Sequence, residues 1–95
     1  MWLFRVAPEK REEFERVYGP EGDWAQLFAK AKNFRGTTLL RDPAIGGRYL
    51  TVDVWESDEA LERFAQEFAT EYQALDKRCE ALTESEMKIG AFDGL

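Results

Sequence analysis

Alternating hydrophobic and polar residues predict four strands along the chain. The pattern is clearest in residues 2–7 (WLFRVA) and 47–56 (GRYLTVDVWE), where side chains of one kind recur at every second position. Residues 34–42 and 86–94 alternate in the same way. The intervening PAIGG segment (43–47) contains two glycines that can adopt positive φ, so strands 34–42 and 47–56 are expected to form a hairpin.

Apolar residues spaced three or four positions apart predict helices between these strands. Residues 9–18 form the first helix, which the GPEG segment (19–22) interrupts, and Asp23 is expected to cap a second helical piece. Ser57 is expected to cap a longer helix. One stripe of that helix contains Leu61, Phe64, Phe68, Tyr72, Leu75, Cys79 and Leu82. Because Cys79 lies on this stripe, we interpret it as a buried apolar group rather than a nucleophile.

The order strand, helix, strand, strand, helix, strand predicts an α+β fold. Right-handed crossovers in each half give a ferredoxin-like βαββαβ subunit, in which the first and third strands are central and the helices cover one face of a four-stranded antiparallel sheet. With 95 residues, the chain is long enough for one small domain, which we place at residues 1–95.

This arrangement leaves one face of the sheet without helices. We expect Leu50, Val52 and Val54 to point toward the helices, together with Phe4 and Val6 of the first strand. Arg5, Tyr49 and Trp55 are then expected on the bare face, along with Leu3, Thr51 and Asp53. Because such a face is apolar enough to require a cover, we predict a homodimer with Arg5, Tyr49 and Trp55 at its interface.

Composition narrows the function classes. The formal net charge is −6 and no basic cluster stands out, which disfavours nucleic acid and anionic membranes as partners. The chain contains no histidine and one cysteine, so no His-ligated metal, His-based relay or internal disulfide is available, and we expect no metal or cofactor. The N-terminal residues lack the features of a signal peptide, which favours the cytoplasm.

Four segments resemble a known family. FERVYGPEGDWAQLF (14–28), GTTLLRD (36–42), RYLTVDVWES (48–57) and YQALDKRCEALTESEMKIGAF (72–92) are similar to the antibiotic biosynthesis monooxygenase family of small proteins, and to a branch that carries a YGPxGDW segment. The resemblance covers nearly the whole chain. It implies a dimeric α+β barrel, in which the sheets of two ferredoxin-like subunits pack together, and a cavity between sheet and helices in each subunit.

The resemblance also implies a range of activities. Members include cofactor-free oxygenases of aromatic polyketides and haem-degrading enzymes, and many have no assigned activity. Haem degradation fits poorly because the chain has no histidine for the iron. The motifs that carry the resemblance are mostly structural, so they assign no catalytic residue.

Asp53 is the best candidate for a catalytic base. A cofactor-free oxygenase needs a base in a dry pocket, and Asp53 is a carboxylate among aromatic residues in the middle of a strand. Burial would raise its pKa, whereas a nearby Arg5 would lower it. The alternative is a buried or dimer-interface ion pair of Asp53 with Arg5 or Arg41.

Trp24, Tyr72 and Asn33 are candidates for substrate binding. The two aromatic residues suit the wall of an aromatic-binding cavity and Asn33 can orient a ligand carbonyl, but each also fits a structural role in the core or at a helix end. Three hypotheses therefore stay open: a cofactor-independent monooxygenase that acts on an aromatic or polyketide-like molecule, a non-catalytic ligand-binding or accessory dimer, and a structural dimer with a filled interior. The cavity and its polar lining would separate them.

Overall fold

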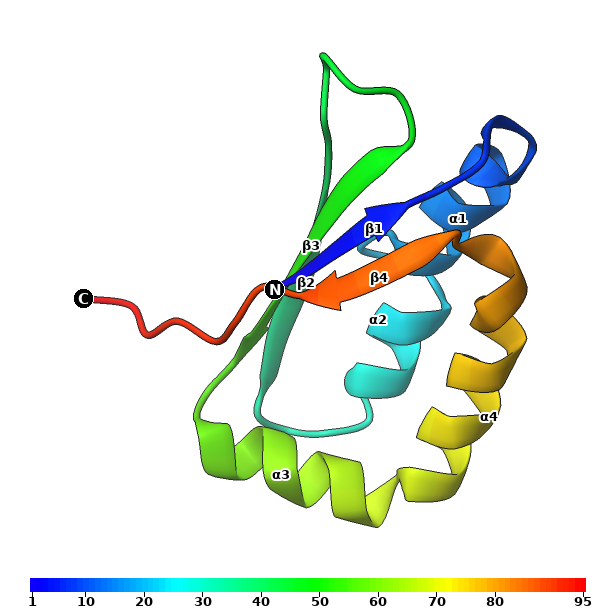
Figure 1. Cartoon of the computed structure of the whole chain (residues 1–95). Coiled ribbons are helices and arrows are strands. Elements are labelled where there is room, and N and C mark those ends of the chain that lie inside the picture. Colours follow the sequence, from blue (N-terminus) through cyan, green and yellow to red (C-terminus); the bar gives the residue numbers. More distant parts are fainter.

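The computed structural model describes all residues from Met1 to Leu95, and its centre is a four-stranded antiparallel sheet (Figure 1). The strand order is β2-β3-β1-β4, so the first and third strands are central. This order and the helices on one face confirm the predicted ferredoxin-like α+β fold. The strands are β1 (Trp2–Arg5), β2 (Phe34–Arg41), β3 (Arg48–Trp55) and β4 (Ser85–Lys88).

The helices follow the predicted order. Gly22 is the N-cap of the second helical piece in place of the expected Asp23, which is its first helical residue. A larger residue does not fit at position 22, because an added Cβ would lie 2.3 Å from the carbonyl oxygens of Arg16 and Val17. Ser57 caps the third helix, where its hydroxyl accepts a hydrogen bond from the Ala60 N–H (3.2 Å). The helices are α1 (Arg11–Tyr18), α2 (Asp23–Phe28), α3 (Asp58–Glu67) and α4 (Ala69–Cys79), with short 3₁₀ turns η1 (Pro8–Lys10) and η2 (Glu80–Leu82).

The single long helix expected after Ser57 is instead two helices. Phe68 (φ −110°, ψ 28°) separates α3 from α4, and the chain turns sharply there (Figure 1). A straight helix over residues 58–82 would be about 38 Å long at 1.5 Å per residue. The longest dimension of the molecule is 35 Å, so the bend is what keeps the apolar stripe on the core. None of the helices combines the length and the apolar character that crossing a membrane requires.

Aromatic side chains fill the layer between sheet and helices. Phe14 and Tyr18 of α1 stack with ring centroids 4.2 Å apart, and Tyr49 of β3 packs on Phe14 at 4.8 Å. Tyr49 is 1% exposed, and its hydroxyl donates a hydrogen bond to Glu15 Oε2 (2.5 Å). Burial, followed by this contact with Glu15, raises the pKa of Tyr49 to about 12. Cys79 is buried on the core side of α4, as predicted.

The predicted orientation of β3 is wrong. Tyr49 is a core residue and Trp55 packs against the core, whereas Val54 is 47% exposed. The register explains this, since Tyr49 lies opposite the buried Phe4 on the neighbouring β1 and must share its face. Tyr49 and Trp55 therefore do not lie on the bare face, where they were expected as interface residues. Alternation could not reveal the error because both faces of β3 carry apolar side chains.

The face without helices carries a row of aliphatic side chains. Leu40 of β2 lies opposite Leu50 of β3, Leu50 opposite Leu3 of β1, and Leu3 opposite Met87 of β4. Leu40 and Met87 are 48% and 55% exposed. Arg5 is exposed and shares this face, as expected from its alternation with the buried Phe4. We call this surface the open face.

Candidate functional site

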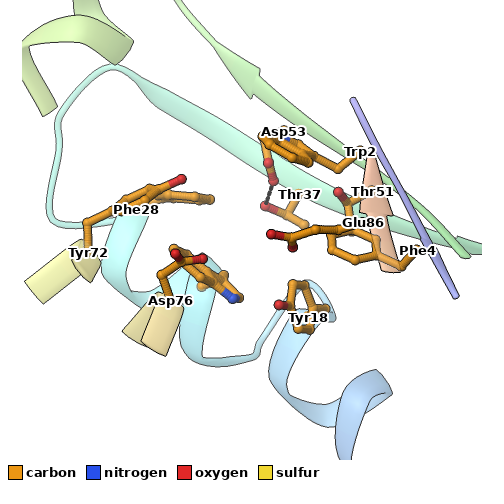
Figure 2. A pocket seen from close by; sticks show the side chains of 11 residues that line it. Trp2, Phe4, Tyr18, Phe28, Thr37, Thr51, Asp53, Tyr72, Asp76 and Glu86 are labelled. Carbon is orange, nitrogen blue, oxygen red and sulfur yellow. Dashed lines mark hydrogen bonds between the residues drawn. The ribbon is translucent and has the colours of Figure 1, made fainter. Parts of the chain in front are cut away.

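A small cavity lies between the sheet and helices α1, α2 and α4 (Figure 2). Its volume is about 60 Å³, which is room for roughly four to six water-sized groups. Six of the eleven lining side chains are apolar or aromatic. The sheet contributes Trp2, Phe4, Thr37, Thr51, Asp53 and Glu86, and the helices contribute Tyr18, Trp24, Phe28, Tyr72 and Asp76. We call this space the inner cavity.

Asp53 lies in the sheet wall of the inner cavity. Its Oδ1 accepts a hydrogen bond from Thr37 Oγ1 (2.7 Å), which β2 places directly opposite it in the register (Figure 2). Burial raises the pKa of Asp53, whereas the Thr37 hydrogen bond and the N-terminal ammonium act in the opposite direction. No arginine or lysine pairs with Asp53. The site thus holds a carboxylate of increased basicity without a balancing basic side chain.

Replacing Thr37 with valine is expected to raise the pKa of Asp53 further. The hydroxyl stabilises the charged carboxylate, so its loss favours the protonated form. Titration of the Asp53 carboxyl carbon by NMR measures the change. Thr37→Ser keeps the donor and should titrate like the wild type, and Thr38→Val on the other face of β2 is the control. An unchanged titration in Thr37→Val contradicts this role for Thr37.

Two more carboxylates line the inner cavity. Asp76 comes from α4 and Glu86 from β4, and they approach the space from opposite walls (Figure 2). Burial is the largest cause of the raised pKa of Glu86, and Asp76 and Glu80 add to it. The pKa of Tyr72 is also raised, first by burial and then by Asp76, Glu86 and Asp53. The negative charges therefore act on a common space around the Tyr72 hydroxyl.

A second space adjoins the inner cavity. Its volume is about 190 Å³, and it shares Tyr18, Asp76 and Glu86 with the inner cavity. The other residues of this space are mostly exposed and belong to the end of α4, η2, β4 and the segment between them. They are Cys79, Glu80, Thr83, Glu84 and Ser85. We call this second space the outer hollow.

The structure brings most of the candidate site residues together. Asp53, Trp24 and Tyr72 all line the inner cavity. Asn33 does not line it, because it precedes β2 and lies beside the end of β3, where its carbonyl oxygen accepts a hydrogen bond from the Glu56 N–H (2.8 Å). In the amide orientation that satisfies both of its neighbours, Nδ2 donates to Glu56 Oε2 (2.8 Å) and Oδ1 accepts from Arg63 Nη2 (3.2 Å). Asn33 therefore connects β3 to α3.

The alternative of an Asp53 ion pair within the chain is wrong. Arg5 lies on the open face, opposite to the face on which Asp53 lies, and Arg41 approaches Glu15 instead (3.9 Å). Pairing depends on which face of the strand each side chain occupies, and the reversed orientation of β3 separates Asp53 from Arg5. The Arg5 pair was inferred from the wrong face, whereas Arg41 shares the face of Asp53 but lies opposite Tyr49, four positions along β2 from Thr37.

Sequence reasoning missed four polar groups of the site. Thr37 and Glu86 enter through the register of β2 and β4, which the local pattern does not encode. Tyr18 was identified only as an apolar helix residue. Asp76 follows Tyr72 by four positions, so their shared helix face was a usable signal.

Comparisons with known proteins agree with this architecture. Residues 1–78 match the family model described as antibiotic biosynthesis monooxygenase. The chain is also similar to the crystal structure of SnoaB, a cofactor-independent oxygenase from Streptomyces nogalater, with a TM-score of 0.60 and 26% identity over 99% of this chain and 91% of that chain. An asparagine-to-alanine mutant of SnoaB gives a TM-score of 0.69 with the same identity and coverage. No protein of curated function is similar enough to be matched.

The family match covers most of the chain, and the solved structures share its fold over almost their whole length. The chain therefore belongs to the antibiotic biosynthesis monooxygenase family.

Proposed function

We propose that the protein is a cofactor-independent monooxygenase that acts on an electron-rich aromatic molecule. The observation that carries this proposal is Asp53, a carboxylate with a raised pKa and no lysine or arginine partner in an aromatic-walled cavity. Similarity to a cofactor-independent oxygenase supports the same reaction type. The carboxylate would act as the base, and the aromatic walls would hold the substrate ring.

The reaction needs a substrate that becomes a reductant when it loses a proton. Asp53 would remove a proton from an acidic methylene group between aromatic rings, and the resulting carbanion would donate electrons to O₂. The hydroperoxide that forms would lose water and leave a ketone. Methylene and O₂ thus become carbonyl and water, so atoms and electrons balance without a further reductant.

The size of the site limits how a substrate can bind. Ligand pockets for drug-sized molecules have volumes of roughly 300 Å³ or more. The inner cavity of about 60 Å³ and the outer hollow of about 190 Å³ are each smaller than this. Because they share three lining residues, we expect one ligand to span both, with its reactive carbon near Asp53.

Oxygen consumption tests this function. Anthrone and a set of hydroquinones are offered to the chelator-treated protein, and O₂ uptake is recorded with an electrode together with product by mass spectrometry. Uptake above the buffer rate with ketone or quinone formation is expected. Binding without uptake for every compound overturns the enzyme proposal and favours the non-catalytic ligand-binding alternative.

We propose in addition that two copies associate through the open face. The row of Leu40, Leu50, Leu3 and Met87 crosses all four strands, and no part of this chain covers it (Figure 1). The segment after β4 leaves on the side away from the helices, and its Phe92 is 67% exposed. A second copy is the natural cover, because twofold self-association pairs identical apolar surfaces.

A further inference from the structure

The two neighbouring spaces beside Asp53 are lined by carboxylates alone among charged side chains. Asp53, Asp76 and Glu86 line the inner cavity, and Glu80 and Glu84 join Asp76 and Glu86 around the outer hollow. Neither space has a lysine or arginine in its lining. The chain as a whole carries a net charge of −6. Such a lining repels anionic ligands and attracts cationic ones.

The inner cavity also holds a hydrogen-bond donor without a well-placed acceptor. Trp24 lines this cavity and is 7% exposed, and its buried indole N–H makes no hydrogen bond of good geometry, although the Tyr18 hydroxyl and the Cys79 thiol lie close enough to interact weakly with it. Buried donors are nearly always paired, and an orphan donor at a cavity wall indicates a missing acceptor. An oxygen atom on a ligand would supply it.

The residues that line the inner cavity indicate which kind of cation would bind there. No three acidic or cysteine side chains are close enough together to hold a metal ion. The inner cavity is instead walled by aromatic rings, including Trp24 and Tyr72, whose faces attract organic ammonium groups. Carboxylates beside aromatic faces are therefore better suited to a protonated amine than to a metal.

Building on the proposed function, we propose that the substrate is an aromatic compound that carries a protonated amine. The ammonium group would lie between Asp76 and Glu86, where the two spaces meet, and an oxygen of the ring system would accept the Trp24 N–H. Ligands with a carboxylate or phosphate at the same position would be excluded.

Binding of three matched probes tests the charge preference. They are 1-(aminomethyl)-2-naphthol, 1-methyl-2-naphthol and 2-hydroxy-1-naphthoate, which differ at one position and are positive, neutral and negative at pH 7. Calorimetry at low ionic strength is expected to show at least tenfold tighter binding of the amine than of the methyl compound, and weaker binding of the acid. Raising the salt concentration should reduce the preference.

Substitutions test which residues cause the preference for the amine probe. Asp76→Asn combined with Glu86→Gln should remove most of the advantage of the amine, whereas Glu62→Gln on the exposed side of α3 should keep it. Trp24→Phe should weaken the binding of 1-(aminomethyl)-2-naphthol more than the binding of 1-(aminomethyl)naphthalene, which lacks the oxygen atom. Thermal unfolding confirms that each variant is folded.

Three results overturn the inference: equal affinity for the three probes, no binding of any of them at millimolar concentration, or an amine preference that survives the double substitution. These outcomes are separate from those of the oxygen assay, because binding is measured without turnover. Preferred binding of the amine without O₂ uptake by any compound would refute the enzyme proposal alone. Efficient oxidation of carboxylated anthrones would refute the amine preference alone.

Discussion

Replacing Asp53 with asparagine is expected to lower the rate of oxygen consumption by about 10²- to 10⁴-fold, the usual contribution of a positioned general base. Asparagine keeps the size of the side chain and its carbonyl oxygen can still accept the Thr37 hydroxyl, so the change removes basicity and little else. The measurement is kcat/KM with the best substrate of the panel. Asp58→Asn in the exposed first turn of α3 is the matched control and should keep full activity.

The same substitution should not destabilise the fold. Burial raises the pKa of Asp53 above its ordinary value of 3.8. The stabilising contribution of this group is therefore fully present below that value and is lost as the pH rises through the pKa of the folded protein. Asparagine resembles the protonated form, so the variant should equal the wild type in acid and be the more stable protein at neutral pH.

Activity and stability thus change in opposite directions over one pH window. The wild-type kcat/KM should rise as Asp53 loses its proton, while its unfolding free energy falls relative to that of Asp53→Asn. Chemical unfolding at several pH values provides the second measurement. A variant that keeps its activity, or loses activity only because it unfolds, would remove Asp53 from the catalytic role.

Replacing Leu50 with aspartate is expected to separate the proposed dimer. Leu50 lies at the middle of the aliphatic row, between Leu40 and Leu3. Twofold symmetry would bury two new charges at once, and the penalty is several kcal/mol per ion. A loss of about 3 kcal/mol in the free energy of dimer association corresponds to a more than hundredfold rise of the dimer dissociation constant. Analytical ultracentrifugation at micromolar protein concentration measures this dissociation constant.

The control is Leu61→Asp. Leu61 is 41% exposed on α3, so the same change there introduces a charge without touching the open face. It should leave the sedimentation coefficient unchanged. A wild-type protein that sediments as a monomer at micromolar concentration refutes the proposed association.

The elements of the fold could be predicted because their signals are local. Alternation identified the strands, although β4 ends at Lys88 rather than at residue 94. The Ser57 cap marked the start of α3, and the order of the elements allowed few topologies. The bend at Phe68 was missed, since the apolar stripe continues through it and only the size of the folded molecule shows that a straight helix would be too long. Asp53, Trp24 and Tyr72 were identified by residue type and position, and the structure places all three around one cavity.

The amino-acid sequence by itself determined the strands, the helices, their order and the aromatic and acidic residues from which a site can be built. Only the tertiary structure decided which face of β3 meets the helices, and with it that Asp53 faces Thr37 and the cavity rather than Arg5. The reason is that both faces of this strand are apolar, so neither orientation is preferred by hydrophobicity alone. The choice depends on contacts between residues that are distant along the chain, such as Tyr49 with Phe14 and Glu15.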